Sequence, residues 1–251
     1  NKAAQNLASH HSHLIVLIYD DPTVYEIPSA GFIIRMQEGA LRACGKANYE
    51  LLIHPCRYRS KNVAAELNGL IEKVRPDGIV LAAPLSNVPR IVKAIESTGT
   101  PLVRISPGTI NGPMATVSTN DHEVGAEMTR YLVSLGHERI AFIKGHPGHK
   151  AVGNRFLGYV DGLKQSGLEV SDDLIVEGDN SIRSGEAAAL KLLDRDNPPT
   201  AIFAANDDMA AGVFRVADRL GISIPDQLSV VGCDDIALAQ QVYPALTTAR
   251  I

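Results

Sequence analysis

The sequence has few of the residues that would mark a metalloprotein, a disulfide-linked domain or a membrane protein. Its 251 residues include three cysteines and no tryptophan. Cys44, Cys56 and Cys233 lack the spacing of metal ligands and cannot all pair with one another, which favours reduced thiols in a cytoplasmic protein. No apolar run approaches the length of a membrane span. Residues 1–9 lack the long apolar core of a secretion signal, although a secreted protein whose signal had been removed would look the same.

The charge balance gives no sign of a nucleic-acid-binding surface. Lysine and arginine total 24 against 28 acidic residues, which leaves a formal net charge of −4. A hydrophobic content of 45% with 21% charged residues is typical of a soluble globular protein. The length suits one large α/β domain or two lobes of ordinary size.

Short apolar runs alternate with longer helical patterns along almost the whole chain. Several runs are apolar at consecutive positions, as expected of parallel strands that are covered on both faces. The predicted strands are Leu14–Tyr19, Tyr49–His54, Gly78–Leu81, Pro101–Ile105, Ala115–Val117, Arg139–Ile143, Leu174–Val176, Thr200–Ala204, Leu228–Val231 and Leu246–Ala249. The predicted helices are Ser29–Lys46, Lys61–Val74, Val88–Thr98, His122–Leu135, Val152–Ser166, Ser184–Asp194 and Asp207–Leu220.

This alternation predicts an α/β protein with a doubly wound, parallel architecture. About ten strands are too many for one small domain, so we expect two lobes, each with its own sheet. The best internal boundary is Leu135-Gly136-His137-Glu138, where a helix stop is followed at once by a new strand. No low-complexity or Pro/Gly-rich linker separates the halves. Short crossover segments should therefore join them, as in proteins with a hinged cleft.

Two predicted strands run directly into polar side chains. The segment from Ala201 leads into Asn206 and Asp207, and the segment from Leu228 leads into Asp234. In a parallel sheet flanked by helices, ligands bind just beyond the carboxyl ends of the strands. Carboxylates accept hydrogen bonds from hydroxyl groups, arginine donates through a planar fork, and asparagine does both. The sequence therefore predicts a binding site for a polar small molecule.

The order of these motifs resembles the effector-binding core of the lactose-repressor/galactose-repressor family of bacterial transcription regulators. The matching segments are PDGIVLAAP at 76–84, PLVRIS at 101–106, VSTNDHEVGAEMTRYLVSLGHERIAFIKG at 117–145, NRFLGYVDGL at 154–163, AIFAANDDMAAGVFRVADRLGISIPDQLSVVGCDDI at 201–236 and YPALTTAR at 243–250. Residues 1–9 resemble the hinge helix that joins such a core to a helix-turn-helix head. The NDDMA segment alone also resembles periplasmic sugar-binding proteins of the same fold.

The resemblance implies a fold like that of type I periplasmic binding proteins. It divides the chain into a hinge-helix remnant at 1–11, an N-terminal lobe at 12–136, a C-terminal lobe at 137–248 and the start of a return to the first lobe at 249–251. The helix-turn-helix head and the last family elements lie outside the given sequence.

We therefore expect a cytoplasmic homodimer that binds operator DNA only through that head. Lobe rotation would alter the dimer contacts, through first-lobe helices that include Ser29–Lys46 and residues 63–74, and would alter the hinge.

In the second lobe, the resemblance assigns effector contacts to Asp234, Arg155 and Asn206. Each has a plainer alternative: Asp234 could cap a short segment, Arg155 could be a solvated helix residue, and Asn206 could be a helix N-cap. Asn180 lies in a loop where relatives carry a stacking aromatic residue, and stacking is in doubt for asparagine. His149 lies where relatives vary their contacts, and solvent exposure is its alternative.

In the first lobe, we expect contacts from Asp20, which ends the strand Leu14–Tyr19, and from Tyr25 in the following loop. The alternative for both residues is a solvated turn. Asp207 is assigned to the helix dipole rather than to the ligand. Asp121 is expected to cap the helix His122–Leu135, and His137 to be a structural residue at the crossover.

The sequence offers little support for catalysis or a cofactor. The segment 145–150, GHPGHK, lacks the ending of a phosphate-binding loop. His146 and His149 have no third metal ligand nearby, and Ser118, Asp121 and His122 form no recognisable nucleophile–base pair. We therefore expect a non-enzymatic sensor without a cofactor, and a sugar effector is favoured while a purine stays open. A periplasmic sugar-binding protein of a transporter is the main alternative, and an enzyme such as a nucleotide-dependent transferase is a weaker one.

Overall fold

A computed structural model describes residues 11–20, 31–108 and 114–251. The predicted hinge segment (apart from residue 11) and Tyr25 lie outside the described residues. The chain forms two compact units, and the principal division falls between Ser118 and Thr119. Each unit is described by itself. Among the described residues, no helix has both the length and the apolar character needed to cross a membrane.

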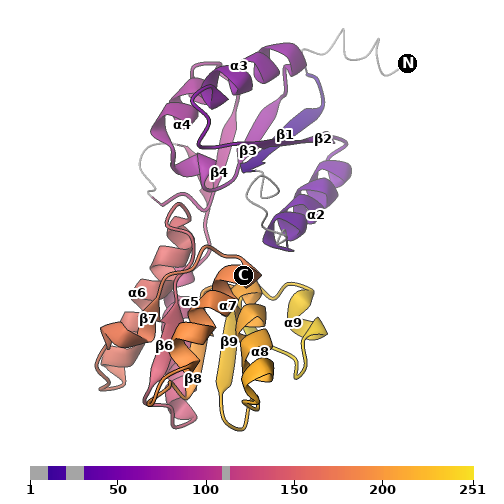
Figure 1. Cartoon of the computed structure of the whole chain (residues 1–251). Coiled ribbons are helices and arrows are strands. Elements are labelled where there is room, and N and C mark those ends of the chain that lie inside the picture. Colours follow the sequence, from indigo (N-terminus) through magenta and orange to yellow (C-terminus); the bar gives the residue numbers. More distant parts are fainter. Residues whose placement is uncertain (1–10, 21–30, 109–113) are drawn as a thin grey trace. The chain divides into compact units, whose positions relative to one another are not determined.

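The first unit is built on a five-stranded parallel sheet in the order β2-β1-β3-β4-β5 (Figure 1). Its strands are β1 (Leu14–Asp20), β2 (Glu50–Cys56), β3 (Gly78–Leu81), β4 (Leu102–Ile105) and β5 (Ala115–Val117). Its helical segments are α2 (Gly31–Lys46), α3 (Val63–Val74), the 3₁₀ turn η2 (Leu85–Asn87) and α4 (Pro89–Glu96).

The second unit holds another five-stranded parallel sheet, in the order β10-β9-β8-β6-β7. Its strands are β6 (Ile140–Ile143), β7 (Ile175–Val176), β8 (Ala201–Ala204), β9 (Ser229–Cys233) and β10 (Thr247–Ala249). Its helical segments are α5 (Asp121–Ser134), α6 (Lys150–Gln165), the 3₁₀ turn η3 (Asp172–Leu174), α7 (Ile182–Leu193), α8 (Asp207–Leu220) and α9 (Leu238–Gln241).

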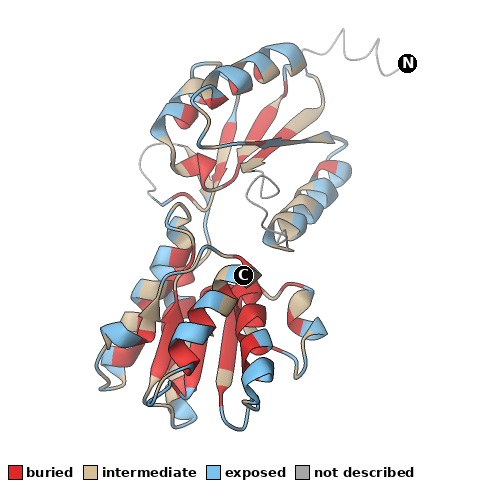
Figure 2. Cartoon of the chain, viewed as in Figure 1, coloured by how far each residue is buried: buried red, intermediate tan, exposed pale blue. Residues whose placement is uncertain are grey.

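Burial explains why the sequence of the second sheet lacks polar alternation. Every residue of β6 and β8 is buried, and so are four of the five residues of β9. Figure 2 shows these strands in red beneath the flanking helices. The carboxyl ends of the strands then bring polar side chains next to a covered core.

Helices α5 and α6 pack closely because glycines face the contact. A Cβ at Gly125 would lie 2.1 Å from the carbonyl oxygen of Arg155, and a Cβ at Gly158 would lie 1.9 Å from that of His122. Only glycine fits at such an approach. This packing places α5 in the second unit. The observed division therefore precedes the one predicted after residue 136, which separated α5 from the helix it packs against.

The fold prediction is confirmed: all ten strands and all seven helices occur where expected, with ends shifted by no more than two residues. The short helix α9 was not predicted, because its four residues offer too little periodicity.

Polar contacts hold the amino-terminal end of the second sheet. His137 places one ring nitrogen 2.9 Å from Thr200 Oγ1 and the other 2.9 Å from Ser229 Oγ, next to the starts of β8 and β9. This supports the structural role that the sequence suggested for His137. Burial lowers its pKa, which keeps the ring neutral between two hydroxyl partners.

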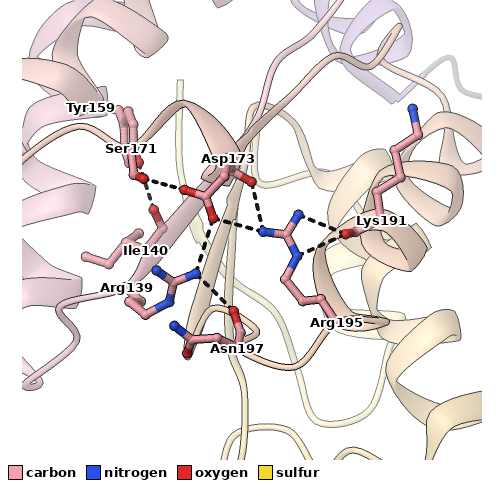
Figure 3. Close-up of polar contacts among 8 residues, drawn as sticks. All are labelled: Arg139, Ile140, Tyr159, Ser171, Asp173, Lys191, Arg195 and Asn197. Atoms are coloured by element: carbon pink, nitrogen blue, oxygen red, sulfur yellow. Dashed lines mark hydrogen bonds and ion pairs between the residues drawn. The ribbon is translucent and has the colours of Figure 1, made fainter.

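A second group of contacts at this end centres on Asp173 (Figure 3). Its carboxylate pairs with Arg195 Nη1 at 3.0 Å and with Arg139 Nη2 at 3.4 Å, and it accepts a hydrogen bond from Ser171 Oγ. The bond from Ser171 and the two guanidinium groups hold the pKa of Asp173 below its usual value. The Asp173 side chain is half exposed, at 50%. We call Asp173, Arg139 and Arg195 the exposed ion-pair group.

Candidate ligand-binding site

Arg155 is the centre of the polar groups at the carboxyl-terminal end of the second sheet. It lies in the second turn of α6 and is only 3% exposed. Its Nε donates to Asp121 Oδ1 at 2.8 Å, and its Nη1 donates to the carbonyl oxygen of Ala205 at 2.6 Å. Its Nη2 lies 3.3 Å from Asp234 Oδ1. The guanidinium therefore joins α5 to the loops that follow β8 and β9.

Asp121 has a different role from the predicted helix cap. It is the first residue of α5, and the N-cap position belongs to Asn120, whose side chain makes no capping bond. The Asp121 carboxylate is 3% exposed and accepts hydrogen bonds from Arg155 and from the hydroxyl group of Thr119. The capping interpretation was wrong because the close packing of α5 on α6 turns this side chain toward Arg155.

The spacing of glycines was the signal that could have paired Asp121 with Arg155. Asp121 precedes Gly125 by four residues, and Arg155 precedes Gly158 by three. Residues three or four apart share one helix face. Two helices that meet at Gly125 and Gly158 therefore bring Asp121 and Arg155 to the same contact.

Asp234 follows β9 and is 7% exposed. It has a φ angle of 118°, a conformation that non-glycine residues rarely adopt, and its backbone N–H donates to the carbonyl oxygen of Ala249 at 2.9 Å. Burial raises the pKa of Asp234 to about 7, against the opposing effect of Arg155. For Arg155, burial alone would lower the pKa, but Asp234 and Asp121 outweigh it and keep the guanidinium charged. A strained, buried carboxyl group beside a fixed cation is typical of a functional position.

Asn206 joins the loops after β7 and β8. Its Oδ1 accepts from the backbone N–H of Met209 at 3.0 Å, which makes it the N-cap of α8, and its Nδ2 donates to the carbonyl oxygen of Asn180 at 3.0 Å. Asn180, at φ 74°, accepts from the N–H of His146 through its own Oδ1 at 3.2 Å. A Cβ at Gly145 would lie 2.0 Å from that oxygen, so glycine is required there. Asn206 therefore caps α8, which is the alternative role that the sequence suggested for it.

Asp207 is fully buried at the start of α8. Its carboxylate accepts from the backbone N–H of Ile236 at 2.9 Å and from the hydroxyl of Thr248. Burial raises its pKa to about 6, while these two bonds act in the opposite direction. Asp207 therefore holds the loop that carries Asp234, in addition to lying at the positive end of the α8 dipole.

His149 occupies the N-cap position of α6, but its side chain makes no capping bond. Its ring lies edge-on to that of His146, with the ring centroids 5.8 Å apart. Burial lowers the pKa of His149 to about 4, and His146 and Arg155 add to this effect. The imidazole is consequently neutral at pH 7, when it offers one donor and one acceptor.

Of the two first-lobe candidates, Tyr25 lies outside the described residues. Asp20 ends β1 in the first unit, and its Oδ1 accepts from the backbone N–H of Tyr58 at 3.0 Å. It therefore fixes the loop after β2. The structure brings together Arg155, Asn180, Asn206 and Asp234, with His149 on the adjoining loop. Throughout the described part of the chain, no three His, Cys, Asp or Glu side chains are grouped to hold a metal ion.

The chain has two units with parallel sheets, and one of them has buried polar groups at its strand ends. This arrangement is typical of α/β ligand-binding proteins. A family model described as periplasmic binding proteins and the sugar-binding domain of the LacI family matches residues 13–250. The chain belongs to this family, and its relatives place it among the effector-binding domains of LacI-type transcription regulators.

The similar proteins agree on that class. The HTH-type transcriptional regulator DegA of Bacillus subtilis is 31% identical over 250 residues, which are 99% of this chain and 72% of DegA. The probable HTH-type transcriptional repressor ExuR of the same organism is 33% identical over 180 residues, which are 72% of this chain and 54% of ExuR. The chain thus matches about half the length of ExuR. The solved complex of the transcriptional regulator CelR with cellobiose has a TM-score of 0.83 at 27% identity, over 98% of this chain and 76% of that one.

Proposed function

We propose that this chain is the effector-sensing core of a cytoplasmic, DNA-binding repressor and that its effector is a small polar molecule, with a sugar as the first choice. The single observation that carries this proposal is Arg155, a buried cation held at converging strand ends between Asp121 and Asp234. Hydroxyl groups of a ligand can replace water on such carboxylates, and a mismatched ligand would leave buried groups without partners. A relative solved with cellobiose supports a sugar.

In this proposal, Asp234, Arg155 and Asn206 hold the effector from the second lobe. Asn180 and His149 contribute from neighbouring loops, and Asp20 and Tyr25 contribute from the first lobe. The effector shifts the lobe equilibrium by its differential affinity for the closed and open arrangements. The core forms a homodimer and passes lobe rotation through the hinge segment to a helix-turn-helix head outside this chain, which binds the operator. The names of the relatives favour this function over a transporter component.

A thermal-shift screen of sugars, sugar phosphates and nucleobases tests the proposal, because a ligand that binds only the folded state raises the melting temperature by mass action. We expect the best ligand to stabilise the wild-type protein and to lose this effect with Asp234→Ala and Arg155→Ala. Asp161→Ala is the matched control, since Asp161 lies on the same helix as Arg155 and is half exposed. An equal shift in all four proteins would show that the ligand binds elsewhere. Sedimentation equilibrium should give a dimer.

A further inference from the structure

The buried end of the second unit contains more acidic groups than basic ones. Arg155 pairs with the carboxyl groups of Asp121 and Asp234, and Asp207 and Asp208 lie in the first turn of α8. All five residues are at most 7% exposed. A buried arginine near a ligand site usually offers its planar fork to a carboxylate or phosphate group of the ligand. Here the protein itself supplies acceptors to that fork.

Each of the three guanidinium nitrogens of Arg155 faces a protein acceptor. Nε donates to Asp121, Nη1 donates to the carbonyl oxygen of Ala205, and Nη2 faces Asp234. A ligand anion would have to displace one of these oxygens and would meet the remaining carboxylates at short range. A neutral hydroxyl group can instead donate to a carboxylate without separating the ion pairs.

We infer that Asp121 determines whether the effector is neutral or negatively charged. Its carboxylate pairs with Nε of Arg155 and neutralises the guanidinium. The site therefore accepts uncharged polyhydroxylated ligands and rejects sugar acids and sugar phosphates. This inference rests on the proposed function, because it concerns the same site. It assigns to Asp121 a positioning and specificity role.

The surroundings of Asp121 fit such a fixed role. Asp121 comes from α5, and α5 is held against α6 by the close backbone contacts at Gly125 and Gly158. One carboxylate oxygen of Asp121 binds Arg155 and the other accepts from the hydroxyl of Thr119. Asp234 and Asp207, in contrast, belong to the loop that follows β9 or hold that loop in place. The position of Asp121 beside Arg155 therefore depends on the contact between α5 and α6 and not on that loop.

The variant Asp121→Asn tests this role because it removes one negative charge and keeps the shape of the side chain. We would measure the binding of inorganic phosphate, and of the pairs glucose/glucuronate and galactose/galacturonate, by calorimetry at fixed ionic strength. Asp121→Asn should bind phosphate and the sugar acids at least about tenfold more tightly than the wild-type protein does, since one buried charge at this range is worth more than that factor.

Two matched variants distinguish the effect of the lost charge from the effect of an altered structure. Asp161→Asn removes a carboxylate that pairs with His122 at 2.9 Å between the same two helices, but at the surface, and it should leave anion binding unchanged. Asp121→Glu keeps the charge and should restore the wild-type preference. An Asp121→Asn protein that binds phosphate no better than the wild type would overturn the inference.

A second binding experiment uses the wild-type protein alone. Within each sugar pair, and between glucose and glucose 6-phosphate, the neutral member should bind more tightly, and a tighter acid or phosphate would contradict the inference. If no neutral sugar binds, the proposed sugar effector fails. The phosphate comparison between wild type and Asp121→Asn still decides the role of Asp121.

Discussion

The two ends of the second sheet carry similar ion pairs in opposite environments. At the amino-terminal end, Asp173 lies between Arg139 and Arg195 with half of its side chain exposed. At the carboxyl-terminal end, Arg155 lies between Asp121 and Asp234, and the side chains of all three are at most 9% exposed. Exposed pairs contribute little to stability, whereas breaking a buried pair leaves an uncompensated charge. The same residue types therefore form a solvent-exposed group at one end of the sheet and a buried, closely coupled group at the other.

The largest difference between the two ends should appear when the central residue of each is removed. Arg155→Ala leaves Asp121 and Asp234 buried without their cation and should lower the free energy of unfolding by about 3–5 kcal/mol. Urea denaturation followed by circular dichroism measures this loss. A loss below about 1 kcal/mol would mean that water reaches the buried group as easily as it reaches the exposed one.

The packing that brings Asp121 to Arg155 can be tested through Gly158. A Cβ there would lie 1.9 Å from a backbone oxygen of α5, so Gly158→Ala should cost about 1–3 kcal/mol or more through overpacking. Gly153 lies on the same helix with open space around it, and Gly153→Ala should stabilise the protein by up to about 1 kcal/mol. Similar melting temperatures for the two variants would remove the steric explanation of this helix contact.

The pH dependence of stability should reveal the partly buried environment of His149. The pKa of His149 is about 4 in the folded protein, against an ordinary value of 6.5, so the unfolded chain binds the proton more readily. This group therefore destabilises the fold progressively as the pH falls from 6.5 to 4. His149→Asn should lose less stability than the wild type in that window. Identical curves for the two proteins would place His149 in solvent.

The smallest effect belongs to the exposed ion-pair group. Asp173→Asn should change the free energy of unfolding by less than about 1 kcal/mol, and the change should shrink further at high salt. Denaturation at two ionic strengths measures it. A loss of unfolding free energy as large as that of Arg155→Ala would show that the exposed and buried ion pairs do not differ in their contribution to stability.

The sequence predicted the fold more fully than the site, for a physical reason. Strands and helices follow from local periodicity, and the polar residues after β8 and β9 follow from their place in a parallel sheet. Arg155, Asn206 and Asp234 were proposed as site residues from the order of family motifs. Asp121 was misread because its role depends on how two helices pack.

The finer contacts depend on side-chain partners that no local pattern encodes. Asp207 was assigned to a helix dipole, yet it also binds Ile236 and Thr248, more than 25 residues away along the chain. Asn180 was judged as a substitute for an aromatic residue, yet its backbone and side chain join two loops. Such roles appear only when the strand ends are brought together.

Hydrogen–deuterium exchange with and without the best ligand from the screen tests most directly whether the carboxyl-terminal end of the second sheet is the binding site. The account predicts slower exchange in peptides that cover residues 145–150, 205–208 and 233–236, and unchanged exchange at residues 171–175 and 195–200 of the opposite end. Protection at the opposite end, with none around Asp234, would contradict it.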